Sequence, residues 1–277
     1  GRGPWDLVGS IREHQNVMAW YGVRAIPVEL NEPLHWVMRD APDVVFVVSA
    51  FLSAYNARAF GVQDYIAQMM FNSPPGTSDA MDLAKMLAIL DLIQPLSNEK
   101  FTIWKQTRIG LLSHPLDAEA ARGHLAASTY LQMALKPHII HIVGHTEADH
   151  AATAEDVIIA SRVTRRAIEN AVRGAPDMCA DPLVQARKDK LVQEAKITLD
   201  EIKNLAHAGV RDPWSDAGTL AEAVGKGILD APQLKNNLFG RGQIRTQVID
   251  GKCLAVDDHK HVLSEEERLE RIRKEKK

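Results

Sequence analysis

The feature of this chain that most constrains its fold is a regular alternation of short β-rich segments with longer helical ones. Segments rich in β-branched and aromatic residues predict four strands, at 22–30, 64–72, 99–107 and 138–143. Helical periodicity predicts helices between and after them, at 43–60, at 78–93, at 114–135, and from Thr153 onward, where Asp156 completes an N-cap pair. Such βα alternation requires crossover connections, and therefore a parallel sheet.

A parallel sheet of this kind either closes into a barrel or stays open with helices on both faces. No GxGxxG motif follows a predicted strand and no GxxxxGK[ST] motif occurs, so nucleotide binding of either kind is disfavoured. We therefore predict an α/β fold in which residues 1–175 form the second half of a (β/α)8 TIM-type barrel, about four βα units.

Half a barrel implies a partner. A full barrel takes roughly 250 residues, and an unclosed parallel sheet exposes two strand edges that invite aggregation. The chain is thus expected to be a fragment or a natural split subunit. In both cases a second chain or segment would supply the first half of the barrel.

The character of the sequence changes after Gly174, and residues 176–277 predict a C-terminal extension. A linker precedes a long helix at about 182–208, which carries Leu191, Ala195, Leu199 and Ile202 on one face. A short helix ending near Leu229 follows. The run "IRTQVIDGKCLAV" predicts a β-hairpin that turns at Asp250-Gly251, and the charged tail, with Ser264 and Glu267 as a capping box, predicts a solvated helix.

Composition excludes several classes of partner. The net charge is −3 and the pI is about 6.4, which provides no overall basic field for nucleic acid or an anionic membrane. The longest apolar stretches fall short of the roughly 20 residues of a membrane span. The start of the chain lacks the apolar region of a signal peptide. Two cysteines without a CxxC motif fit a reducing compartment, so a cytoplasmic location is expected.

The stretch "HIIHIVGHTEADH", His138–His150, is the main candidate for a functional site. Strand alternation would point His141, Val143 and His145 to the barrel interior. The residues that follow the strand, Gly144 to Glu147 with His145 and Thr146 between them, would lie at the C-terminal rim where TIM barrels bind ligands. The other interpretation is that these histidines only fill the interior and a loop.

Two further interpretations of this stretch are disfavoured. His141 and His145 are too far apart along a strand to share one metal ion without other ligands, and no HExxH motif is present, so no metal site is predicted. No Ser-His-Asp or Cys-His arrangement can be assembled either, so the catalytic residues stay unassigned.

Other strand ends offer weaker candidates for ligand contacts. Glu29 and Asn31 follow the first predicted strand and Asn72 ends the second, while Lys105, Gln106 and Arg108 lie at the end of the third. Asn72 and Lys105 are taken as ligand contacts, with a salt bridge at the rim as the alternative for Lys105. Arg241 and Arg245, in the extension, are interpreted as solvated charges.

At this point the chain resembles a known family. The stretch "HIIHIVGHTEADHAAT" (138–153) is similar to the last barrel strand and loop of the large (epsilon) subunit of glutamate mutase, also called methylaspartate mutase. The segment "AEAVGKGILDAP" (221–232), followed by "GRGQIRTQVIDGKCLAV", resembles the tail of that family in order and spacing. The resemblance covers about residues 5 to 257. The same strand end also resembles the cobalamin- and pyridoxal-phosphate-dependent lysine and ornithine aminomutases.

The resemblance implies an adenosylcobalamin-dependent carbon-skeleton mutase, a radical isomerase. Glu147 matches the family's glutamate that holds the adenosyl group, but Val143 stands where the family has a lysine. The cofactor-binding residues expected from motif and position together are Glu147, His145, Gly144, Thr146, Lys105 and Asn72. No Asp-x-His-x-x-Gly motif is present, so a small separate subunit is expected to bind the cobalamin.

The resemblance leaves the substrate open. The family's substrate-gripping arginines lie in the barrel half that this sequence does not contain, so only a small-molecule substrate can be expected. Two rival functions remain. One is an aminomutase-type barrel subunit, although no lysine stands out as a partner for pyridoxal phosphate; the other is a non-catalytic half-barrel that serves assembly.

Overall fold

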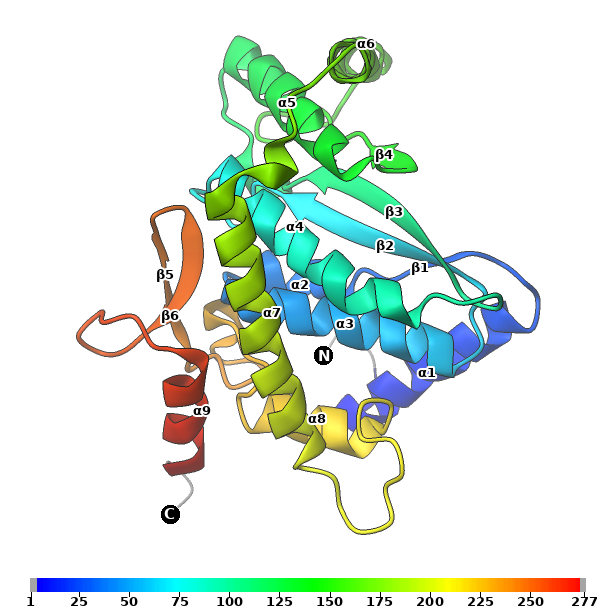
Figure 1. Cartoon of the computed structure of the whole chain (residues 1–277), viewed down its shortest axis with the longest axis vertical. Helices are drawn as coiled ribbons and strands as arrows, with labels where there is room; N and C mark the ends of the chain where they lie inside the picture. Colours follow the sequence, from blue (N-terminus) through cyan, green and yellow to red (C-terminus); the bar gives the residue numbers. More distant parts are fainter. Residues whose placement is uncertain (1–3, 275–277) are drawn as a thin grey trace.

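Four parallel strands form the centre of the molecule, in a computed structural model that describes residues 4–274. The strands β1 (Val28–Glu29), β2 (Asp64–Phe71), β3 (Thr102–Ile109) and β4 (Ile139–His141) lie side by side in chain order (Figure 1). Every neighbouring pair is parallel. The predicted α/β class is confirmed, and the sheet is a four-stranded half-barrel.

The predicted helices form, with small shifts of their ends. They are α3 (Asp43–Ala59), α4 (Asp79–Ile93), α5 (Ala118–Gln132) and α6 (Ala154–Val172). The side chain of Thr153 caps α6 together with Asp156 in a complete capping box, as predicted. Two further helices, α1 (Leu7–Gly22) and α2 (Glu32–Val37), were not predicted. Helix α1 continues to Gly22 and a turn follows it at 23–25, where Ala25 has a positive φ, so the predicted strand at 22–30 is reduced to the two residues of β1.

Helices cover one face of the sheet, and the main apolar core lies beneath them. Helix α3 is buried along almost its whole length, because the sheet lies on one side of it and α7 (Pro182–Lys203) on the other. Helix α7 runs alongside α4 (Figure 1), and its predicted apolar face is buried at Leu191, Ala195, Leu199 and Ile202. One core therefore contains residues from the barrel half and from the extension.

The rest of the extension packs on this core. It contains α8 (Ala217–Gly225), the antiparallel hairpin of β5 (Arg245–Ile249) and β6 (Lys252–Val256), and α9 (Glu265–Lys274). Asp250 and Gly251 both adopt positive φ, as the predicted two-residue hairpin turn requires. Short 3₁₀ turns complete the chain, at Gln94–Leu96, Leu111–Ser113, Met133–Leu135, Met178–Ala180 and Pro232–Leu234.

The prediction of a solvated tail helix is wrong for one face of α9. The capping box of Ser264 and Glu267 is present, but Glu265, Arg268 and Leu269 are buried. The guanidinium of Arg268 pairs with Glu265 and donates to the carbonyls of Gly227 and Ile228. The alternating charges along α9 therefore gave no indication that one of its faces packs against the rest of the chain. Residues 275–277 of that predicted helix lie outside the described residues.

The aspartate of the motif "GILDAP" in the extension has a structural role. Asp230 is buried and accepts hydrogen bonds from the backbone N–H groups of Gly242, Gln243 and Ile244. Arg241, predicted to be solvated, is half-buried and donates to the carbonyl of Lys226, whereas Arg245 is exposed and pairs with Asp258. Within residues 4–274, no helix combines the length and the apolarity that crossing a membrane requires.

Candidate functional site

The face of the sheet that points away from α3 and α4, here called the inner face, carries a polar network across three strands. The carboxylate of Glu29 on β1 accepts a hydrogen bond from Nε2 of Gln68 on β2 at 2.6 Å, and a second from Nε2 of Gln106 on β3 at 2.7 Å. The two glutamines are direct neighbours in the register, and they are only 4% and 5% exposed. One carboxylate thus bridges the middle of the sheet.

Arg108 and His141 lie two residues nearer to the C-terminal strand ends than Gln106. Arg108 of β3 stands between Met70 of β2 and His141 of β4 in the register. Burial lowers the pKa of Arg108 from its usual value, and the nearby Glu29 and Glu147 oppose this effect. Burial and the neighbouring Arg108 lower the pKa of His141, so its imidazole is neutral at pH 7. Glu29, Gln68, Gln106, Arg108 and His141 are named the inner-face cluster.

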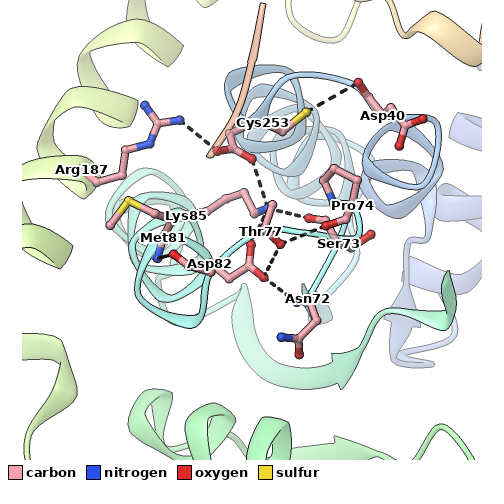
Figure 2. Close-up of polar contacts among 12 residues, drawn as sticks. Asp40, Asn72, Ser73, Pro74, Thr77, Met81, Asp82, Lys85, Arg187 and Cys253 are labelled. Carbon is pink, nitrogen blue, oxygen red and sulfur yellow. Dashed lines mark hydrogen bonds and ion pairs between the residues drawn. The ribbon is translucent and has the colours of Figure 1, made fainter. Parts of the chain in front are cut away.

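The tip of β2, at Asn72 to Pro74, is held by a buried ionic network (Figure 2). Nζ of Lys85 on α4 donates to the carbonyl of Ser73 at 2.7 Å and pairs with Asp82 at 2.8 Å and with Asp43 at 3.2 Å. Arg187, from α7, pairs with Asp43 at 2.9 Å. Burial disfavours the charge on Lys85, but the two carboxylates outweigh it and hold its pKa above the usual value.

This network explains the conformation of the strand tip. Asp82 accepts from the backbone N–H of Asn72 and from Oγ1 of Thr77, so the turn after β2 is tied to α4. The side chain of Asn72 donates to Asp79 and accepts from Ser128 of α5. Asn72, predicted as a ligand contact, is thus buried with both ends of its amide engaged by helices. Its position supports a structural role at the rim.

The end of β4 differs from the prediction. The strand stops at His141, and Val143 turns into a small apolar cluster with Ile109, Leu125 and Ala160. The prediction that His141, Val143 and His145 all point to the barrel interior is therefore wrong for Val143 and His145, which lie beyond the end of the strand. The chain leaves the sheet early because Val143, only 4% exposed, is buried against α5 and α6 instead of pairing along β3.

The predicted rim residues after β4 do lie together, in a turn that precedes α6. His145 is buried, with Nε2 at 3.9 Å from Oδ1 of Asp156. The carbonyl of Thr146 accepts from the backbone N–H groups of Asp149 and His150, and that of Gly144 accepts from the N–H of Glu147. Of the four predicted residues, only Glu147 is exposed. It is therefore the side chain of this turn best placed to contact a bound molecule.

Lys105 does not join the other predicted residues. Because β3 continues to Ile109, Lys105 lies in the middle of the strand, not at its end. Its side chain leaves on the helix-covered face and donates to the carbonyl of Leu135, near Lys136. Alternation along the strand separates it from its neighbours Gln106 and Arg108: the latter lies on the inner face, nearer to the tip. Strand alternation would have separated Lys105 from the C-terminal rim if the end of β3 at Ile109 had been known from the sequence.

Three histidines gather behind the rim, and sequence reasoning singled out only one of them. His114, after β3, lies edge-on to His124 of α5 with ring centroids 5.5 Å apart. Burial, together with His124 and His145, lowers the pKa of His114 to about 4, so its ring is neutral at pH 7. Within the described residues, no group of three or more histidine, cysteine or acidic side chains is arranged to hold a metal ion.

Comparison with known proteins adds no family to these observations. No family model matches the chain, and no curated protein matches it.

Proposed function

We propose that this chain is part of an adenosylcobalamin-dependent carbon-skeleton mutase, as one half of a TIM-type barrel of the glutamate mutase kind. The observation that carries the proposal is the inner-face cluster. It places a carboxylate, two oriented amides, a guanidinium and a neutral imidazole on the inner face of four parallel strands. TIM barrels bind their substrates at the C-terminal strand ends.

The residues present fit adenosylcobalamin only in part. Glu147 is exposed at the rim and offers the acceptor that an adenosyl group needs. Val143, where the family has a lysine, is enclosed by Ile109, Leu125 and Ala160 and does not reach a rim ligand. Bound cobalamin supplies the radical that a skeleton rearrangement requires. This chain would hold one adenosyl contact, and a small separate subunit would bind the cobalamin itself.

The edge of the half-barrel supports a partner that supplies the first half. Strand β4 has three residues and pairs on one side with β3. Its first residue, Ile139, is 39% exposed, and on α6 Val157 and Ile158 are about half exposed. Apolar side chains along an open parallel edge favour burial by further βα units. We propose that these residues meet the neighbouring strand and helix of the missing half.

The rival functions receive different support. A pyridoxal phosphate enzyme needs a reactive lysine at the rim, but Lys85 is paired with two carboxylates and Lys105 is directed to the helix side. The aminomutase alternative is therefore the weaker. A non-catalytic half-barrel is favoured by the burial of Val143, which removes one adenosyl contact. The inner-face cluster argues for chemistry, because an assembly subunit has no need of it.

The test is adenosylcobalamin binding, followed by the change in its visible spectrum, with this chain and the proteins encoded beside it. We expect binding only when a small cobalamin-binding partner is present. Glu147→Gln should weaken it about tenfold, the loss of one good hydrogen bond to a charged group. The matched control is Glu155→Gln, an exposed carboxylate on α6. If no combination binds cobalamin, the mutase proposal is rejected and the assembly function takes its place.

A further inference from the structure

Two polar atoms of the inner-face cluster are buried and have no hydrogen-bond partner among residues 4–274. They are Oε1 of Gln68 and Nε of Arg108. Buried side-chain polar atoms are paired in the large majority of cases, because leaving one unpaired costs about 1–3 kcal/mol. An acceptor and a donor on the same face are thus both left without a partner among the described residues.

Besides the unpaired Nε–H group, the guanidinium of Arg108 also has no ion-pair partner among residues 4–274. Its side chain is half-buried, yet no carboxylate of residues 4–274 forms an ion pair with it. The acidic groups that influence it, Glu29 and Glu147, act only through space, and Glu29 is already bonded to the two glutamines. A partly desolvated cation without a counterion is unfavourable. Arg108 is therefore a ready site for an anion.

The hydrogen bond to Glu29 fixes the orientation of the Gln68 side-chain amide. Since Nε2 of Gln68 donates to Glu29, the remaining oxygen of the amide can only accept. This acceptor belongs to the register level of Gln106, and Arg108 is two residues nearer to the rim on the same face. Two residues along a strand span about 6.6 Å. The acceptor thus lies deep and the cation lies near the rim.

We propose that this half of the barrel binds a small carboxylate whose anionic end faces Arg108 near the rim and whose hydroxyl or amino group donates to Oε1 of Gln68. The inference rests on the proposed function for placing the inner face inside a barrel. It adds that this chain supplies a specificity-determining pair, Arg108 for charge and Gln68 for the donor. The neutral imidazole of His141, beside Arg108, completes the wall without adding charge.

The test uses the full chain and three small probes: glycolate, which has both groups; acetate, which lacks the hydroxyl; and ethylene glycol, which lacks the carboxylate. Binding is read from the arginine Nε–H resonances by NMR, in which the Arg108 signal is identified by its loss in Arg108→Gln. We expect glycolate to shift that signal. Acetate should bind about tenfold more weakly, since one buried acceptor stays unpaired, and ethylene glycol should have no effect.

Variants separate the two halves of the inference. Because Arg108→Gln lacks the Arg108 signal, its glycolate binding is measured by isothermal titration calorimetry alongside the unchanged chain, and we expect it to be abolished. Gln68→Met should reduce glycolate binding to the level of acetate while leaving acetate unchanged. Arg162→Gln, an exposed arginine of α6, is the matched control and should bind glycolate like the unchanged chain.

Several results would overturn the inference. Equal shifts with acetate and glycolate would remove the role of Gln68, and an Arg108 signal that no probe moves would remove the site. If Arg108→Gln instead abolished association with the partner proteins while glycolate had no effect, Arg108 would be a residue that pairs across the barrel interface. No cobalamin is used here, so glycolate binding without cobalamin binding would keep this site and reject the mutase.

Discussion

Gln106 donates to the carboxylate of Glu29 at 2.7 Å although 77 positions separate the two residues in the chain. Gln68 makes the same contact from the strand between them, so a single carboxylate orders the inner face of β1, β2 and β3. This arrangement leaves the oxygen of Gln68 as a buried acceptor and places Arg108 above it. The inner-face cluster is therefore a preorganised surface whose contribution to stability can be measured apart from any ligand.

Glu29→Gln is expected to lower the free energy of unfolding by about 1–3 kcal/mol. The substitution removes the negative charge and one of the two oxygens, so one buried amide loses its acceptor. Urea unfolding followed by circular dichroism measures the effect. Glu99→Gln is the control at an exposed position and should change stability little. Equal stabilities of Glu29→Gln and the unchanged chain would contradict the role given to Glu29.

Lys85→Met is expected to be much more severe, with a loss of about 3–5 kcal/mol. The ammonium is fully buried, and its removal leaves Asp82 unpaired and Asp43 with Arg187 alone. The double variant with Asp82→Asn should recover part of the loss, because one uncompensated charge is removed. Lys196→Met, exposed on α7, is the matched control. Additive losses in the double variant would show that Lys85 and Asp82 do not act as a pair.

His114 should make the protein less stable in mild acid. Its pKa is about 4 in the folded chain, where burial keeps the ring neutral, and near 6.5 in the unfolded chain. The unfolded state therefore binds the proton more readily, and stability falls as the pH drops from about 6.5 to about 4. The slope from this group is at most about 1.4 kcal/mol per pH unit.

The measurement for His114 is the urea midpoint as a function of pH. His114→Asn should flatten the curve between pH 4 and 6.5, whereas His259→Asn, at an exposed position, should leave it unchanged. A curve of the same shape in His114→Asn and in the unchanged chain would mean that other groups cause the acid sensitivity.

Val143→Lys tests whether the missing lysine of the family can be restored. Because Val143 is enclosed by apolar side chains, we expect several kcal/mol of destabilisation from the buried charge and no gain in adenosylcobalamin affinity. Val172→Lys, at a largely exposed position of α6, should change stability by no more than about 0.5 kcal/mol. A stable Val143→Lys variant with tighter cobalamin binding would show that this position reaches the rim.

Local signals in the sequence predicted the elements well wherever the deciding contacts are local. The capping box at Thr153 and Asp156, the hairpin turn at Asp250-Gly251 and the apolar face of α7 all form as expected. Each depends on residues within a few positions of one another. Helix α1 was missed, although a local signal for it is present: Asp6 caps it by accepting from the N–H of Gly9.

The candidate site could be predicted only in part. Glu147 lies exposed at the rim, as the resemblance implied, but Lys105 and Asn72 face the helices and Val143 turns into a side cluster. The assumed ends of β3 and β4 were each off by two residues, so Lys105 lies within β3 and Val143 lies beyond the end of β4. Asn72 follows β2 as predicted, but its amide is engaged by Asp79 and Ser128 of the neighbouring helices.

By itself, the sequence determined the order of the four strands and of the helices from α3 onward, the parallel sheet, and several caps and turns, since periodicity and short-range hydrogen bonds decide these. Only the tertiary structure decided which polar groups meet. Lys85 joins Asp43 and Arg187, and Glu29 joins Gln68 and Gln106, from segments far apart in the chain. Such groups are buried only when the sheet and its helices pack. The pairing therefore depends on strand register and helix placement, which local sequence signals do not specify.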